Sequence, residues 1–334
     1  CSGLQLRVHR FDSVLSLHDM KILLTGSSGF IGFHLAKKLL ELNHHVYGID
    51  NHNDYYNVEL KAERLSLLRH KNFNFYNSDI ANLKLRETFD MAINFAAQAG
   101  VRVDKEQEKF FHQYNVLGFK KFCQFCKNNN VKRIIYASSS AVYSDESSKP
   151  FNEASTPLKP KSLYGKSKLE NEVFASKFSL SNQITMIGLR FFSVYGPFGR
   201  PDMAYYSFTN SISRNKEIKI YNLGDMYRDM TYIDDIIDGT IGSLNYLKTI
   251  DKPGNTLINL GNEQPIKTIE LLREIEKKLN IGARIRYENS AYESKYTHAD
   301  IEKAKALFSY MPKFNLDEGL SRFIKWYKDY EHIH

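Results

Sequence analysis

A short apolar run that leads directly into a glycine-rich turn and then into a helix constrains this chain more than any other feature. Residues 21–25 are expected to form a strand, and the turn that follows is Gly26-Ser27-Ser28-Gly29-Phe30-Ile31-Gly32. The first glycine permits a tight turn, the second lets backbone N–H groups approach phosphates, and the third lets the helix pack closely on the strand. The positive end of the helix dipole favours an anion there. The spacing predicts a dinucleotide site made by Gly26, Gly29, Phe30, Ile31 and Gly32.

Short β-rich runs alternate with amphipathic segments from Met20 onward. This alternation predicts an α/β fold with a Rossmann-type doubly wound parallel sheet that carries helices on both faces. After Pro197 the rhythm loosens, and a smaller C-terminal lobe is expected over the carboxyl ends of the strands, where such sheets bind ligands. The expected strands are 21–25, 45–49, 74–76, 91–95, 133–137, 184–189, 218–221 and 256–260. The expected helices are 31–42, 110–128, 164–178, 266–279, 301–307 and 316–330.

The domain boundaries follow from the same pattern. Residues 1–19 show neither the apolar stretch nor the cleavage site of a signal peptide, so we interpret them as an N-terminal extension, native or introduced by cloning, and leave them out of the fold reasoning. Residues 20–190 are expected to form a dinucleotide-binding Rossmann domain, rejoined by about 228–262. Residues 191–227 and 263–330 are expected to form the substrate-binding lobe.

Composition excludes several classes of protein. No run approaches the roughly 20 apolar residues of a membrane helix, so no membrane association is expected. Three cysteines, Cys1, Cys123 and Cys126, are too few for a disulfide-stapled secreted protein and predict the reducing cytoplasm. Cys123 and Cys126 have no second Cys or His pair at zinc spacing, so no metal site is predicted. The formal charge of +8 is spread among acidic neighbours, which argues against nucleic acid as a partner and suits small polyanions.

Further cofactor residues are expected at the ends of the next strands. Asp50 closes the second strand, where a carboxylate accepts the ribose hydroxyls and repels a 2′-phosphate, so NAD is predicted rather than NADP. Asp79 and Ile80 follow the third strand, where a carboxylate can meet the adenine amino group. Taken singly, each of these later residues is as compatible with an ordinary loop. The predicted set beyond the glycine turn is Asp50, Asn51, Asp79, Ile80, Ala96, Ala97 and Gln98.

A serine cluster and a Tyr-x-x-x-Lys pair predict the chemical centre. The run 138–140 closes the fifth strand with three serines, and Tyr164 and Lys168 lie four positions apart on one face of the next expected helix. A free tyrosine has a pKa of about 10, which makes it a poor base at neutral pH. A nearby ammonium and the positive nicotinamide ring both favour the phenolate. Together these groups can take a proton from a substrate hydroxyl while hydride leaves its carbon.

On these motifs the chain resembles the extended short-chain dehydrogenase/reductase superfamily, and within it is similar to bacterial UDP-glucuronate 4-epimerases. The similarity extends from Met20 to about residue 330. The segments that carry it, beyond the glycines and the Tyr164 and Lys168 pair, are DNHNDYY (50–56), AAQAGVR (96–102), GLRFFSVYGP (188–197), GRPDMA (199–204), YNLGDM (221–226) and RDMTYIDD (228–235).

The resemblance implies a role for each site residue. Ser139 is the implied catalytic hydroxyl, Tyr164 the base, and Lys168 the cofactor anchor that also lowers the pKa of the tyrosine. Tightly bound NAD would be recycled, and the smaller lobe would bind a UDP-sugar, with Arg228 on the pyrophosphate. The resemblance also implies a place in polysaccharide biosynthesis and a homodimer through the helices at 110–128 and 164–178. A face buried within the monomer explains those apolar helices equally well. The implied substrate-binding residues are Ser139, Ser140, Ser193, Arg200, Tyr221 and Arg228.

Ala141 bears on which reaction follows oxidation. Similar decarboxylases and 4,6-dehydratases carry an acidic residue directly before the Val-Tyr pair, and Ala141 cannot transfer a proton. This favours 4-epimerisation of UDP-glucuronate to UDP-galacturonate through a 4-keto intermediate, with Ser139, Ser140 and Ser193 restraining the carboxylate. Ser144, the run 291–293 and Ala141 itself, which stands where similar glucuronate enzymes tend to have a hydroxyl, depart from the family pattern, so a neutral or N-acetylated UDP-hexose stays open. A UDP-glucuronate decarboxylase, a net oxidoreductase and an NAD-binding scaffold without catalysis stay open as well.

Overall fold

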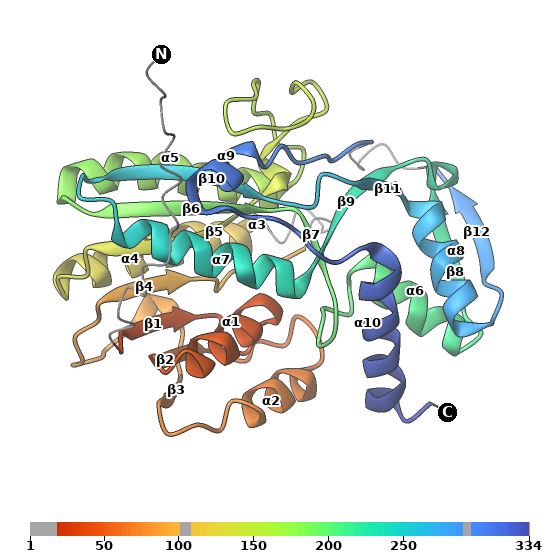
Figure 1. Ribbon diagram of the computed structural model, residues 1–334, viewed down its shortest axis with the longest axis horizontal. Helices are drawn as coiled ribbons and strands as arrows, with labels where there is room; N and C mark the ends of the chain where they lie inside the picture. Colours follow the sequence, from red (N-terminus) through yellow and green to blue (C-terminus); the bar gives the residue numbers. More distant parts are fainter. Residues whose placement is uncertain (1–18, 101–107, 290–294, 334) are drawn as a thin grey trace, which may run out of the picture.

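The computed structural model describes residues 19–100, 108–289 and 295–333. The extension at 1–18, the end of the AAQAGVR segment and the run 291–293 lie outside the described residues. Within them, parallel strands form a seven-stranded sheet in the order β10-β6-β5-β4-β1-β2-β3 (Figure 1). The strands are β1 (Lys21–Thr25), β2 (His45–Asp50), β3 (Phe73–Asn77), β4 (Met91–Asn94), β5 (Arg133–Ser139), β6 (Thr185–Phe191) and β10 (Gly254–Leu260).

Helices cover both faces of this sheet, and the doubly wound fold predicted from the sequence is confirmed. Helices α1 (Phe30–Glu41) and α7 (Ile233–Lys248) pack together on one face, while α4 (Gly118–Asn128) and α5 (Leu163–Asn182) cover the other (Figure 1). Side chains of β1 point alternately to the two faces of the sheet. Ile22 and Leu24 belong to the core on the α1 side, and Leu23 belongs to the core on the α4 side. Cys123 and Cys126 lie buried in the latter core, where burial raises the pKa of both thiols.

The smaller lobe lies beside the carboxyl ends of the strands (Figure 1). It contains a three-stranded sheet in the order β11-β9-β7 and a two-stranded sheet of β8 and β12. Its strands are β7 (Ser193–Tyr195), β8 (Glu217–Tyr221), β9 (Tyr227–Tyr232), β11 (Pro265–Lys267) and β12 (Arg284–Glu288). Its helices are α6 (Ala204–Ser213), α8 (Thr268–Leu279) and α10 (Leu316–Glu331), and α9 (Glu302–Phe308) packs on α7. None of the described helices is both long and apolar enough to span a bilayer.

Several elements differ from the sequence expectation. The expected helix 110–128 is divided into α3 (Glu108–Phe110), a π-helical segment η3 (Phe111–Leu117) and α4, and the expected helix at 266 begins as strand β11. Helices α2 (Val58–Ser66), α6 and α7 were not predicted. In α7 the glycines hide the helical signal: a Cβ at Gly242 would lie 2.5 Å from the Phe308 ring, so close packing selected a poor helix former.

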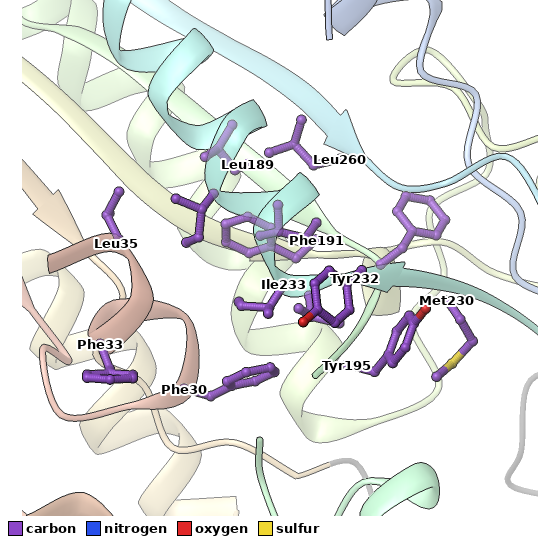
Figure 2. Close-up of a cluster of buried hydrophobic side chains, with 14 of the residues drawn as sticks. Phe30, Phe33, Leu35, Leu189, Phe191, Tyr195, Met230, Tyr232, Ile233 and Leu260 are labelled. Carbon is purple, nitrogen blue, oxygen red and sulfur yellow. The ribbon is translucent and has the colours of Figure 1, made fainter. Parts of the chain in front are cut away.

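An aromatic cluster joins the sheet to the smaller lobe. Figure 2 shows Phe191 and Leu260 from the ends of β6 and β10 above Tyr195, Tyr232 and Ile233. The rings of Tyr195 and Tyr232 lie 5.6 Å apart in an edge-to-face arrangement. Because these side chains are almost fully buried, the two parts of the chain share one hydrophobic core.

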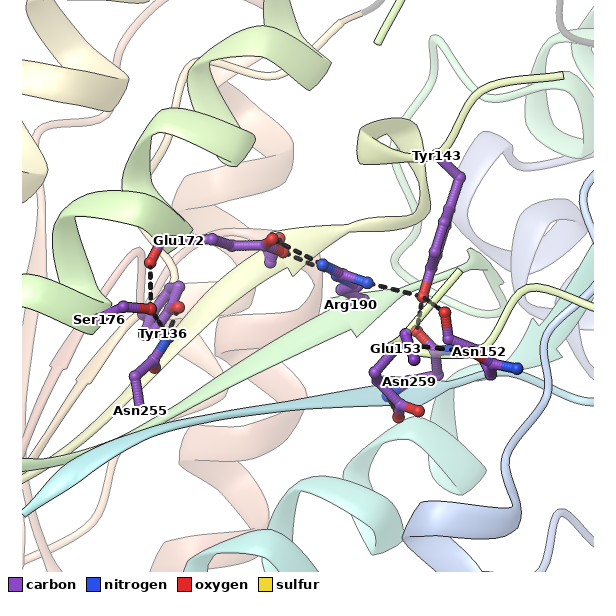
Figure 3. Close-up of polar contacts among 11 residues, drawn as sticks. Tyr136, Tyr143, Asn152, Glu153, Glu172, Ser176, Arg190, Asn255 and Asn259 are labelled. Atoms are coloured by element: carbon purple, nitrogen blue, oxygen red, sulfur yellow. Dashed lines mark hydrogen bonds and ion pairs between the residues drawn. The ribbon is translucent and has the colours of Figure 1, made fainter. Parts of the chain in front are cut away.

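A buried ion pair ties α5 to the sheet (Figure 3). The guanidinium of Arg190 in β6 donates from Nε and Nη2 to the two carboxylate oxygens of Glu172, at 2.8 and 2.7 Å. Its Nη1 donates to the hydroxyl of Tyr143, and the Ser138 hydroxyl donates to Glu172. Arg190 is 1% exposed, so water does not stabilise its charge. The Arg190 guanidinium and the Glu172 carboxylate therefore stabilise each other.

This network yields a stability prediction. Glu172→Gln leaves the Arg190 guanidinium buried without its counter-charge, so we expect the free energy of unfolding to fall by about 3–5 kcal/mol. The matched control is Glu170→Gln on the same helix, since Glu170 pairs with Lys120 at the surface and should cost at most about 1 kcal/mol. Urea denaturation followed by circular dichroism measures both, and equal losses for the two variants would contradict the prediction.

Candidate active site

The glycine turn is held by backbone contacts that leave no room for side chains. A Cβ at Gly32 would lie 2.0 Å from the carbonyl oxygen of Gly26, and one at Gly26 would lie 2.7 Å from the amide nitrogen of Ala96. Gly26 also has a φ of 74°, in the left-handed region that glycine tolerates best. The N–H of Gly26 donates to the carbonyl of Ile49 at 2.8 Å, which fixes the turn to β2.

The beginning of α1 fits a phosphate. Gly29 is its N-cap, no side chain caps it, and the first turn contains no acidic residue, so its N–H groups remain available to an anion. Phe30 is buried in the core and Ile31 is half-buried against it. The Asp50 carboxylate accepts N–H groups of Ser28 at 3.1 Å and His52 at 2.9 Å, so it lies beside the glycine turn.

The remaining predicted cofactor residues line the same sheet edge. Asn51 donates to the Asp79 carboxylate at 3.4 Å, and Asp79 caps the short helix η1 (Ile80–Asn82), in which Ile80 packs against Gly118. Ala96 and Ala97 follow β4 beside the glycine turn, and the Ala96 N–H donates to Thr25. The N–H of Gln98 donates to the Asn115 side chain at 2.7 Å. Polar groups, small residues and a free helix terminus therefore converge as a dinucleotide requires.

Ser139, Tyr164 and Lys168 come together at the end of β5. Tyr164 and Lys168 project from the first turns of α5, and the Lys168 ammonium lies 5.5 Å from the centroid of the Tyr164 ring. Lys168 donates to the carbonyl of Ala137 at 2.9 Å, which holds it under the strand end. The Ser139 hydroxyl lies near enough to the Tyr164 hydroxyl to favour its phenolate, and it accepts the N–H of Ala141 at 3.1 Å. This arrangement can exchange a proton with an alcohol placed between the serine and the tyrosine.

The pKa values of this cluster follow from burial and neighbouring charges. Burial raises the pKa of Tyr164, whereas the charge of Arg200 and the polar hydroxyl of Ser139 oppose that shift. Burial lowers the pKa of Lys168 to about 8, and the nearby carboxylate of Glu172 acts in the opposite direction. Lys168 is therefore mostly charged at neutral pH and loses its charge above about pH 8.

Arg200 lies close enough to Tyr164 to act on it electrostatically. Its Nε donates to one oxygen of Asp202 at 3.0 Å and its Nη2 to the other. Asp202 therefore occupies one edge of the guanidinium fork. The second edge, at Nη1, bonds to no described residue. A guanidinium can hold a second carboxylate on that edge.

The other predicted substrate residues lie on four separate elements. Ser140 begins the short helix η4 (Ser140–Val142) directly after β5, and Ser193 begins β7 opposite Met230. Tyr221 ends β8 and Arg228 lies in β9. The neighbour of Arg228, Asp229, is fully buried and accepts N–H groups of Asn262, Glu263 and Ala299, so β9 is held firmly.

Sequence reasoning missed Asn115. It lies in the π-helical segment η3, and its side chain donates to the carbonyl of Gln98 at 2.9 Å and to Ser167 on α5 at 3.1 Å. It therefore connects the expected cofactor segment after β4 with the helix that carries Tyr164. A π-helical turn inside an otherwise regular helix often marks a functional site, but no spacing rule reveals it in one sequence.

The chain matches known proteins along most of its length. Residues 22–261 match the NAD dependent epimerase/dehydratase family. The chain is 37% identical to Protein CapI of Staphylococcus aureus over 93% of this chain and 99% of that protein. It is 35% identical to UDP-glucuronate 4-epimerase 2 of Arabidopsis thaliana over 97% of this chain and 79% of that protein. A crystal structure of Bacillus cereus UDP-glucuronic acid 4-epimerase with UDP-glucuronic acid and NAD is similar with a TM-score of 0.87 at 33% identity, covering 93% of this chain and 100% of that chain.

The glycine turn gives a prediction that needs no substrate. Gly32→Ala places a methyl group against the Gly26 carbonyl, so we expect the turn to open, the protein to lose about 1–3 kcal/mol of stability and the purified protein to retain much less dinucleotide. Gly282→Ala is the control, since nothing lies within 4 Å of its Cβ position. Chromatography of the nucleotide released on denaturation and a thermal melt measure both effects. Full retention of dinucleotide in Gly32→Ala would contradict this account of the turn.

Proposed function

Since the chain belongs to the NAD dependent epimerase/dehydratase family, we propose that it inverts carbon 4 of a UDP-sugar, with UDP-glucuronate and UDP-galacturonate as the interconverted pair. The observation that carries the proposal is the contact of Ser139, Tyr164 and Lys168 at the strand edge that also holds the glycine turn. The relatives named above, which include UDP-glucuronate 4-epimerases from a plant and a bacterium, support the choice of sugar.

The residues of the chain account for the proton transfer. The Tyr164 phenolate accepts the proton of the sugar O4, while Ser139 shares a hydrogen bond with the same oxygen. Lys168 favours the phenolate through its charge and is held in place by the Ala137 carbonyl. Gly26, Gly29, Gly32, Asp50 and the segment 96–98 would hold NAD. The chemistry that NAD supplies when bound is reversible hydride transfer at C4 of the sugar.

Inversion places a further demand on the site. Loss of the O4 proton and of hydride from C4 produces a 4-keto sugar, and return of hydride to the opposite face of C4 and of the proton to O4 gives the epimer. The sugar must therefore turn while the nucleotide stays bound. Arg228 and Tyr221 are proposed to hold the nucleotide side, since a guanidinium suits a pyrophosphate and the buried Asp229 anchors the strand of Arg228.

The free edge of Arg200 favours a uronic acid over a neutral hexose. A substrate carboxylate can bind at Nη1 while Asp202 keeps the other edge, and Ser140 and Ser193 can donate further hydrogen bonds. A restrained carboxylate matters because a 4-keto uronic acid is a β-keto acid that loses carbon dioxide readily. Ala141 next to Ser140 offers no proton to a decarboxylation or dehydration step, which makes a decarboxylase the weaker candidate.

An apolar strip over two neighbouring helices supports a homodimer. Phe110 and Leu117 are exposed on the segment that leads into α4, and Val173 and Leu180 are exposed on α5. The two helices contact each other and are also joined by the Lys120–Glu170 ion pair. An exposed apolar strip on paired helices suits packing against a second copy into a four-helix bundle. We place the protein in the cytoplasm, in the supply of sugars for polysaccharides.

Turnover of a panel of UDP-sugars tests the function. We expect NMR to show UDP-glucuronate and UDP-galacturonate interconverting, with neither free NADH nor carbon dioxide accumulating. Tyr164→Phe should lower the rate by about 10²–10⁴-fold while NAD stays bound, because it removes the general base alone. Accumulating NADH would instead indicate a net oxidoreductase, and no turnover of any UDP-sugar would indicate a scaffold. Turnover of UDP-glucose but not UDP-glucuronate would overturn the substrate assignment.

The dimer is tested separately. Val173→Glu places a charge in the apolar strip, so light scattering after gel filtration should shift from twice 38.8 kDa toward a single chain. Leu67→Glu is the matched control, because Leu67 is equally exposed but lies at the end of α2, away from the strip. A wild-type protein that elutes as a single chain, or a Val173→Glu protein that remains dimeric, contradicts the proposal.

A further inference from the structure

The loop between β7 and α6, residues 196–203, carries Arg200 and Asp202 and is called the substrate loop below. Phe198 in this loop has a φ of 56°, in the left-handed region that a residue with a bulky side chain adopts only at a cost of about 1–3 kcal/mol. Such a conformation persists only where surrounding contacts fix it. The contacts around Phe198 therefore show what determines the position of Arg200.

Arg64 of α2 is one source of these contacts. It is fully buried, and it donates to the Phe198 carbonyl from Nε at 3.1 Å and from Nη2 at 2.6 Å. Nη2 also donates to the Gly199 carbonyl at 3.0 Å. Nη1 donates to the carbonyl of Ser28, in the glycine turn, at 3.1 Å and to the Tyr56 hydroxyl at 2.6 Å. One guanidinium thus joins the expected cofactor turn to the substrate loop.

The acceptors of Arg64 are neutral. Four of these hydrogen bonds end on backbone carbonyls and one on a tyrosine hydroxyl. A lysine could keep the positive charge, but its single ammonium cannot reach acceptors on two loops with the planar fork of an arginine. The shape of the donor group, rather than its charge, therefore determines the loop position.

Further contacts hold the same loop from the cofactor side and from the smaller lobe. The Phe198 ring packs between Phe33 of α1 and Trp326 of α10, with centroids 5.1 and 4.9 Å away. The hydroxyl of Tyr55 donates to Asp202 at 3.3 Å. Tyr55 lies shortly before Arg64, in the segment that connects the end of β2 at Asp50 to α2. Asp202 in turn holds Arg200 by two hydrogen bonds.

We propose that Arg64 and Tyr55 are positioning residues for sugar binding: they fix the substrate loop to the glycine turn so that Arg200 presents its free edge to the sugar. The inference rests on the proposed function for the identity of that sugar. Because Arg64 contacts both loops, a dinucleotide that orders the glycine turn also orders the substrate loop. By thermodynamic linkage, NAD and the UDP-sugar then strengthen each other's binding.

The experiment uses the NAD-loaded protein in a Tyr164→Phe background, so that bound sugar is not converted. Binding of UDP-glucuronate is measured by calorimetry, and deuterium exchange of the amides of 196–203 is measured without sugar. The variants are Arg64→Lys, Arg64→Met and Tyr55→Phe. Lys61→Met is the matched control, because Lys61 is buried one turn earlier on α2 but donates only to Asn53 and not to the substrate loop.

We expect both Arg64 variants to bind UDP-glucuronate about tenfold more weakly or worse, and to exchange the loop amides faster, with NAD retained. Tyr55→Phe, which removes one hydrogen bond at the surface, should weaken binding by about threefold to tenfold. Lys61→Met should lower stability but leave both readouts within about twofold of the parent. Rescue by Arg64→Lys would show that charge alone matters and would overturn the proposal.

The remaining outcomes also support or overturn the proposal. If the Arg64 variants fail to fold or lose NAD, Tyr55→Phe carries the test, since it changes one hydroxyl and no buried charge. Unchanged binding and exchange in Tyr55→Phe then overturn the proposal. If the parent binds no UDP-glucuronate, the proposed substrate fails, but the exchange measurement still tests the role of Arg64 and Tyr55, because it needs no sugar.

Discussion

The close approach of α1 to β1 is the constraint on which the rest of the site depends. Gly32 lies against the Gly26 carbonyl so tightly that a single methyl group would separate helix from strand. This contact places the uncapped N-terminus of α1 at the edge of the sheet. It also positions Ser28 so that its N–H donates to Asp50 and its carbonyl accepts from Arg64. Arg64 extends the same chain of contacts to the substrate loop. A steric limit at two glycines thus determines where the cofactor turn, and through it Arg200, can lie.

Helix α5 carries the proposed reactive groups, Tyr164 and Lys168, on an inward face that is polar. Tyr164, Lys168 and Glu172 follow one another at intervals of four residues, and Ser167 and Asn171 are buried beside them. Such a face costs solvation energy unless every group is paired. Glu172 is paired with Arg190, and Lys168 donates to a backbone carbonyl. The helix is therefore fixed in rotation about its axis, and this holds the tyrosine hydroxyl next to Ser139.

The sequence predicted those features that depend on local spacing. The parallel sheet, the family and the glycine turn were evident from strand periodicity and from short motifs, and the comparisons confirm the fold and the family. The roles of the individual site residues stay predictions. Helix α7 escaped prediction because its glycines serve packing, and the π-helical turn of Asn115 has no spacing signature. Contacts such as Arg64 to Phe198 join residues far apart in the chain, so no local pattern could indicate them.

The proposed mechanism assigns two cations, Arg200 and Lys168, to the stabilisation of the Tyr164 phenolate. In the protein alone, Arg200 neutralises Asp202 and also opposes the rise that burial causes in the pKa of Tyr164. A substrate carboxylate on the free edge of Arg200 would add a second negative charge beside that guanidinium. The net electrostatic stabilisation that reaches the Tyr164 phenolate would then be smaller. In the proposed mechanism, Lys168 supplies the remaining stabilisation. Its pKa of about 8 keeps it charged at neutral pH, and the Glu172 carboxylate, itself balanced by Arg190, prevents burial from lowering that value further.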